Sequence, residues 1–192
     1  MANAAMDRLR RLGLLIPVFS LRRDDDLGIG DTSALREMVD WAAEHRIGFL
    51  QLLPINETGS DNSPYNAISS IALDPVLLDM EAIPEIGVDD IRAAAKQFGT
   101  DQQGGDLVDY EVSKRAKWKL LGDGFDRFCQ AGSQDPAFEA FRLAEQEWLV
   151  PYCQYRWLME MAATEEWESW PDAYNTREKA ELYLAGPDAR EA

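Results

Sequence analysis

Two short apolar runs separated by one helical segment constrain the fold of this chain most strongly. The runs cover residues 12–19 and 49–53, and each resembles a strand buried on both faces of a sheet. Between them, apolar side chains recur at helical spacing after several candidate N-caps (Asp31, Thr32, Ser33), and Gly48 ends the helix. Strand, helix and strand in this order predict a right-handed parallel βαβ unit.

The rest of the chain shows mainly helical patterns. Apolar residues repeat at helical spacing from Asp89 onward, and Asp135-Pro136 predicts the start of a helix. Asn175 followed by Glu178 predicts a capping box at a later helix. Residues 74–79 are predicted as a short extended piece, and residues 99–106 as a polar linker or loop.

The length of the chain does not suit a complete α/β domain of this type. A parallel sheet of two strands cannot bury both of its faces, and a barrel of eight βα units takes about 250 residues. This chain has 192 residues and spends more than half of them after the second strand. We therefore predict an α/β fold that is incomplete, with a βαβ part at residues 1–80 and a mostly helical subdomain at residues 81–192.

The net charge and the cysteine content limit which kinds of ligand and which cellular location we expect. The formal net charge is −16, which disfavours nucleic acid and anionic membrane surfaces and suits a neutral ligand. No apolar run approaches the roughly 20 residues of a membrane span, and the N-terminus does not resemble a signal peptide. Cys129 and Cys153 are too few for a disulfide framework, so we expect reduced thiols and a cytoplasmic protein.

The densest candidate site is the polar loop of residues 61–66, just beyond the second strand. Ligands of parallel α/β folds bind at the carboxyl ends of the strands. Ser63 offers a hydroxyl and Tyr65 a ring face, which together suit a neutral ligand rich in hydroxyl groups. The alternative is a simple turn, with Pro64 fixing the backbone and Tyr65 packed as a lid over the core.

Other candidate features favour structural interpretations. Gly28-Ile29-Gly30-Asp31 follows its strand too distantly for a dinucleotide fingerprint, and we expect a loop leading into the helix. His45 is expected to stabilise the end of that helix. We expect no metal site. Four tryptophans are expected in the core, with a sugar-stacking surface as the alternative, and three glutamates on a solvated face (Trp148, Trp157, Trp167, Trp170; Glu165, Glu166, Glu168).

Six segments together resemble the N-terminal end of the 4-α-glucanotransferases (amylomaltases or disproportionating enzymes, in the α-amylase clan). In chain order they are residues 13–22, 27–31, 41–43, 51–58, 63–66 and 73–79. The resemblance implies a (β/α)₈ TIM barrel that acts on α-1,4-glucans with retention and uses neither metal nor organic cofactor. The helical remainder resembles the insertion between the second and third barrel strands of that family.

The resemblance also implies roles for site residues. Tyr65 matches a tyrosine that lines the sugar subsite at the point of cleavage, and Ser63 matches a serine that contacts the substrate. The family's nucleophile, acid/base and stabilising carboxylates follow later barrel strands, so no catalytic residue is assigned here. The chain alone is expected to be inactive, with a missing C-terminal part as a conceivable second chain. A non-catalytic glucan-binding module and a helical interaction protein remain the alternatives.

Overall fold

A computed structural model describes residues 12–24, 26–100, 107–132 and 135–186. The chain divides into two compact units. Unit 1 comprises Met1–Glu57 and Leu73–Gly132, and unit 2 comprises Thr58–Ala72 and Ser133–Ala192. These two units differ from the predicted subdomains, which meet at residue 80. The predicted boundary concerns the subdomains of a longer protein and stays a prediction.

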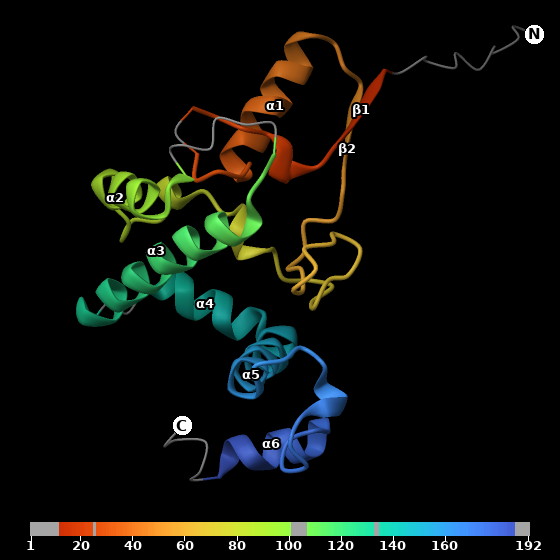
Figure 1. The fold of residues 1–192 in the computed structure, drawn as a ribbon, viewed down its shortest axis with the longest axis vertical. Helices are drawn as coiled ribbons and strands as arrows, with labels where there is room; N and C mark the ends of the chain where they lie inside the picture. The colour runs from red at the N-terminus through yellow and green to blue at the C-terminus, as the bar shows by residue number, and fades with distance from the viewer. Residues whose placement is uncertain (1–11, 25, 101–106, 133–134, 187–192) are drawn as a thin grey trace, which may run out of the picture. The chain divides into compact units, whose positions relative to one another are not determined.

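The predicted βαβ unit is present in unit 1. Strands β1 (Gly13–Ile16) and β2 (Phe49–Leu52) pair in parallel, in register from Gly13 with Phe49 to Ile16 with Leu52. Helix α1 (Thr32–Glu44) connects them and lies beside the strands (Figure 1). Asp31 caps α1 because its carboxylate accepts hydrogen bonds from the backbone N–H groups of Ser33 and Ala34. The prediction of strand, helix and parallel strand is confirmed.

The prediction that both faces of these strands are buried is wrong for the described part of the chain. Leu15 in the middle of β1 is 59% exposed, and Phe49 at the start of β2 is also exposed. The sheet has two strands here, so one helix covers only part of its apolar surface. Continuous apolar runs such as these are typical of strands in a larger sheet with layers on both faces.

Two helices complete the core of unit 1. Helices α2 (Val88–Phe98) and α3 (Tyr110–Gln130) pack side by side (Figure 1), around buried Ile91 and Leu120. Short 3-10 helices occupy Val18–Ser20, Pro75–Leu77 and Met80–Ala82. The predicted extended piece at residues 74–79 is therefore wrong, because the Asp74 carboxylate binds the Val76 N–H and closes a helical turn.

Unit 2 is built from helices and the loop at residues 58–72. Its elements are α4 (Pro136–Ala144), α5 (Gln146–Ala162), a 3-10 helix (Trp167–Ser169) and α6 (Arg177–Ala185). Asp135 caps α4 as predicted. The cap of α6 is Thr176 rather than Asn175, because the Thr176 hydroxyl accepts the hydrogen bond from the Lys179 N–H. Of the predicted linker at residues 99–106, residues 101–106 lie outside the described residues.

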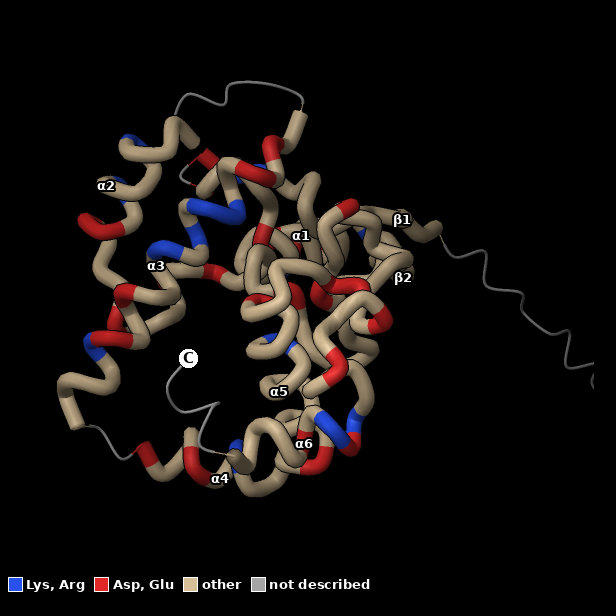
Figure 2. Tube along the Cα trace, turned by 60° about the horizontal axis from the view of Figure 1, so that its bottom comes forward, with Lys and Arg blue, Asp and Glu red and all other residues tan. Residues whose placement is uncertain are grey.

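The surface of both units carries the acidic excess of the sequence. Acidic positions lie on the helices of each unit, interspersed with fewer basic ones (Figure 2). Among the helices that the structure describes, none combines the length and the apolar character that a membrane crossing requires.

Candidate functional site

The loop at residues 58–72 is folded by its own polar side chains. Thr58 and Ala67 form an antiparallel bridge that closes it. Inside it, the Asp61 carboxylate accepts hydrogen bonds from the Ser63 N–H at 2.9 Å and from the Asn66 amide at 3.1 Å. Asn62 has a positive φ of 55°, which asparagine tolerates better than most residues. These interactions fix the turn that carries the predicted site residues.

Ser63 and Tyr65 lie close together on that turn. The Tyr65 N–H donates to the Ser63 hydroxyl oxygen at 3.3 Å, and the hydroxyl can still donate its own hydrogen. Tyr65 is 77% exposed, so it does not pack as a lid over a core. The turn therefore presents a hydroxyl and an accessible aromatic ring to solvent, whereas contact with a sugar stays a prediction.

Glu165 ties this loop to the helical part of unit 2. Its carboxylate accepts hydrogen bonds from the Ser60 N–H at 3.0 Å and from the Ser60 hydroxyl at 2.9 Å. Gly59 makes room for this approach, since a Cβ there would lie 2.5 Å from a carboxylate oxygen of Glu165. Glu165 is thus half-buried and has a specific partner, whereas Glu166 and Glu168 are exposed, as predicted for a solvated face. The partner of Glu165 is 105 residues away in the sequence, and no local pattern marks such a contact.

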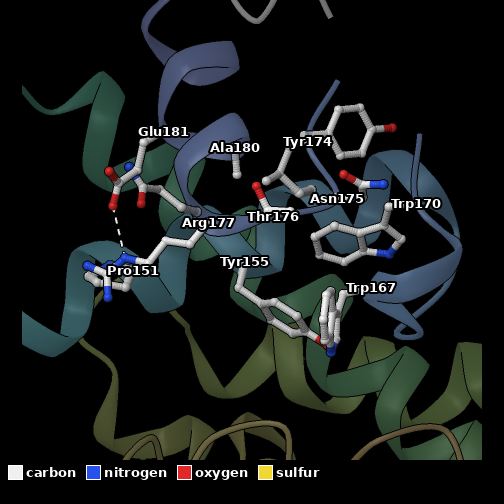
Figure 3. A pocket seen from close by; sticks show the side chains of 12 residues that line it. Pro151, Tyr155, Trp167, Trp170, Tyr174, Asn175, Thr176, Arg177, Ala180 and Glu181 are labelled. Carbon is white, nitrogen blue, oxygen red and sulfur yellow. Dashed lines mark hydrogen bonds and ion pairs between the residues drawn. The ribbon is translucent and has the colours of Figure 1, made fainter. Parts of the chain in front are cut away.

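Unit 2 also contains an aromatic pocket with a volume of about 480 Å³. Tyr155, Trp167, Trp170 and Tyr174 line one part of it (Figure 3). Trp170 is buried in the core of the unit, as predicted, whereas Trp167 is 49% exposed. Trp157 is 42% exposed and lies outside the lining. The core interpretation of the tryptophans therefore holds for Trp170 and is wrong for Trp157 and Trp167.

A buried lysine in unit 1 has the charged neighbours that an active site often shows. Lys117 on α3 is 1% exposed, and its ammonium group donates to the Leu78 carbonyl at 2.8 Å. Burial lowers the pKa of Lys117 to about 8, although the nearby carboxylates of Asp31, Asp26 and Asp79 oppose this effect.

The carboxylates near Lys117 already have structural partners. Asp31 caps α1, Asp26 accepts from the Arg23 and Gly28 N–H groups, and Asp79 accepts from the Ser33 hydroxyl and the Glu81 N–H. The cavity volume beside these groups is only about 10 Å³. Such a space holds no substrate, so the arrangement stabilises unit 1 and is not a catalytic site.

Two features with structural predictions behave as expected. Gly30 belongs to the loop that leads into α1, where a Cβ would lie 2.1 Å from the Val18 carbonyl oxygen. His45 follows α1, with its Nδ1 2.8 Å from the Trp41 carbonyl oxygen and its ring stacked on the Trp41 indole.

Within the described residues, no group of three or more His, Cys, Asp or Glu side chains is placed to hold a metal ion.

Comparison with known proteins gives a consistent result. A family model described as 4-alpha-glucanotransferase matches residues 16–191. The 4-alpha-glucanotransferase of Chlamydia caviae is 36% identical over 84% of this chain and 31% of its own length. The enzyme of the same name from Thermus thermophilus is 31% identical over 92% of this chain and 34% of its own length. The chain thus spans about a third of the length of these relatives.

A solved structure resembles the fold. The amylomaltase of Streptococcus agalactiae, determined in complex with acarbose, superposes with a TM-score of 0.75 at 21% sequence identity. The match covers 95% of this chain and 36% of the amylomaltase. At this identity the likeness establishes an α/β fold of the glycosidase kind. None of these comparisons favours a non-catalytic binding module or a helical interaction protein.

Proposed function

The chain belongs to the 4-alpha-glucanotransferase family, and from this membership we propose that it is part of an enzyme that transfers α-1,4-glucan segments between glucans by a retaining mechanism. The observation that carries the proposal is the family match over residues 16–191. The resemblance found from the six ordered segments to the N-terminal portion of these enzymes is confirmed by the relatives.

In this proposal, β1, α1 and β2 are the first βαβ unit of a (β/α)₈ barrel. The helices that follow Leu73 form the insertion that precedes the third barrel strand. The exposed apolar side chains of Leu15 and Phe49 support this, because neighbouring strands and helices of a barrel cover such positions. The remaining barrel is supplied by residues beyond the matched third, in the same chain or as a second chain.

The loop with Ser63 and Tyr65 contacts the substrate in the proposed enzyme. Its uncharged hydroxyl and ring suit a neutral oligosaccharide, and the related amylomaltase of Streptococcus agalactiae was solved with acarbose bound. A cytoplasmic location is part of the proposal, supported by the unpaired thiols of Cys129 and Cys153.

The chain does not catalyse transfer by itself. A retaining mechanism requires a carboxylate nucleophile and a carboxylic acid about 5–5.5 Å apart on either side of the scissile bond. In the proposed assignment these groups follow later barrel strands, outside the matched third of the family. Residues of this chain hold and orient the glucan, and the bond-breaking groups come from the rest of the enzyme.

Binding of maltoheptaose, followed by saturation-transfer NMR, tests the role of the loop. We expect binding in the millimolar range for the chain, because the opposite wall of the cleft lies elsewhere. Tyr65→Ala removes the exposed ring and is expected to weaken the signal at least about threefold, whereas Ile71→Ala in the same loop leaves it unchanged. Equal signals from the chain and from Tyr65→Ala would contradict the proposed role of Tyr65.

A further inference from the structure

We propose that the aromatic pocket of unit 2 is an additional α-glucan site, which holds a second part of the polymer or a second glucan. The class of ligand in this inference rests on the proposed function. The location of the site rests on the geometry of the pocket. The pocket volume of about 480 Å³ falls within the ~300–1,000 Å³ of small-molecule sites.

One end of the pocket presents aromatic carbon surface rather than polar atoms. The Trp170 indole N–H donates to the Thr164 carbonyl at 2.8 Å, and the Tyr155 hydroxyl donates to the Glu165 carbonyl at 2.9 Å. Since these polar ends are bound to the backbone, the rings contribute carbon to the lining, and Trp170 and Tyr174 form its buried part. The ring centroids of Tyr155 and Trp170 lie 5.3 Å apart, and those of Trp170 and Tyr174 lie 6.0 Å apart.

Trp167 provides the accessible part of this surface. Its indole lies next to Tyr155 at one end of the pocket (Figure 3), and half of its side chain area is open to solvent. A pyranose ring has two faces made of C–H groups, which pack against an indole, and an equatorial edge of hydroxyls. An exposed tryptophan beside buried rings therefore fits a sugar face better than a compact charged ligand.

The other end of the pocket carries the polar groups that a sugar edge requires. Arg177 Nε and a Glu181 carboxylate oxygen form an ion pair at 3.0 Å (Figure 3). Asn175 also lines the pocket but lies beside Trp170. Donor and acceptor lie side by side in the ion pair, which matches two neighbouring hydroxyls. The pair has no net charge, so within this acidic protein the pocket favours a neutral ligand over an anionic one.

The same unit connects the pocket to the loop with Ser63 and Tyr65. Glu165 binds Ser60 of that loop through its carboxylate and binds Tyr155 of the pocket through its carbonyl. A glucan seated in the pocket is thus held by the unit that also carries the proposed substrate loop. This arrangement suits a polymer substrate, which gains affinity from more than one point of attachment.

Fluorine NMR of the chain labelled with 5-fluorotryptophan tests the proposal directly. The six tryptophan resonances are assigned by single Trp→Phe replacements, and maltoheptaose is titrated into the labelled chain. We expect the Trp167 resonance to shift with saturation, also in the Tyr65→Ala variant. Trp167→Ala is expected to weaken binding at this site at least about tenfold, as followed by the Trp170 resonance.

Trp157→Ala is the matched control, because Trp157 is similarly exposed in the same unit but does not line the pocket. It is expected to leave the titration unchanged. A signal that depends on Tyr65 while Trp167 and Trp170 stay unperturbed would overturn the inference and leave the proposed function intact. Absence of any response to maltoheptaose, at the loop and at the pocket, would overturn the inference and count against the proposed function as well.

Discussion

Glu165 is the residue whose role depends most on long-range folding. Its two hydrogen bonds to Ser60 hold one end of the loop that carries Ser63 and Tyr65. Glu165→Ala is expected to lower the local opening free energy of that loop by about 1–2 kcal/mol, because both charge-assisted bonds are lost. Hydrogen exchange of the Ser60 amide measures this as a roughly tenfold faster rate.

Glu166→Ala is the control for this prediction, since Glu166 is the exposed neighbour on the same turn. The hydrogen exchange rate of the Ser60 amide in Glu166→Ala should equal that of the parent chain. Unchanged exchange at Ser60 in Glu165→Ala would show that the loop does not depend on this carboxylate.

Lys117 predicts a specific pH dependence of the stability of unit 1. Its pKa in the folded protein is about 8, below the 10.5 of an unperturbed lysine, so the unfolded chain binds more protons between these values. The free energy of unfolding therefore rises with pH in this window, by at most about 1.4 kcal/mol per pH unit. Above about pH 10 the effect of Tyr110 opposes it, because burial raises the pKa of Tyr110 to about 12.

Urea denaturation between pH 8 and 10 checks this expectation. Lys117→Met removes the titrating group and is expected to flatten the rise across the window, whatever its stability at neutral pH. Lys114→Met, on the same helix, is expected to retain it. A rise of equal slope in Lys117→Met would assign the pH dependence to other groups.

At the scale of the elements, the connection into α1 shows why its glycine is required. A Cβ at Gly30 would meet the backbone carbonyls of Val18 and Leu21 at 2.1 and 2.5 Å, and neither can move freely. Gly30→Ala is expected to destabilise unit 1 by about 2–3 kcal/mol, as measured by urea denaturation. Gly122→Ala on α3, where the added Cβ meets nothing within 4 Å, is expected to stabilise by about 0.5–1 kcal/mol. Equal effects of the two changes would refute this account of the loop.

The elements with strong local patterns were the ones the sequence could predict. The strand pair, α1 with its Asp31 cap and α4 with its Asp135 cap each depend on neighbouring residues, and each is confirmed. The turn at Asp74 was mistaken for an extended piece, because a single side-chain hydrogen bond decides it.

The candidate site was predictable only in part, because local sequence patterns do not mark long-range contacts. The loop with Ser63 and Tyr65 follows a strand and contains turn-forming residues, so its position could be deduced. The contact of Glu165 with Ser60 joins residues 105 positions apart, and that of Lys117 with the Leu78 carbonyl joins residues 39 positions apart. The aromatic pocket combines side chains of α5, α6 and the segment between them. Periodicity and spacing carry no information about such contacts.

At the scale of the whole molecule, the exposed strands predict self-association of the isolated chain. β1 and β2 pair with each other, and Leu15 presents an apolar side chain beside the backbone of a short sheet. Leu15→Lys is expected to reduce light scattering on concentration without lowering the free energy of unfolding by more than about 0.5 kcal/mol.

Leu182→Lys serves as the control, because Leu182 is also an exposed leucine but belongs to α6 rather than to a strand. It should not change the scattering. An equal reduction of light scattering by both variants would indicate a general gain in solubility rather than association through the strands. A parent chain that stays monomeric on concentration would contradict the prediction.

We propose that this chain holds an α-1,4-glucan while the groups that break the bond lie in the rest of the enzyme. One NMR sample of the purified chain with maltotriose tests both parts. We predict saturation transfer from the protein to maltotriose, with no glucose or maltotetraose formed during long incubation. Steady formation of these products by the chain, free of any contaminating enzyme, would contradict the claim.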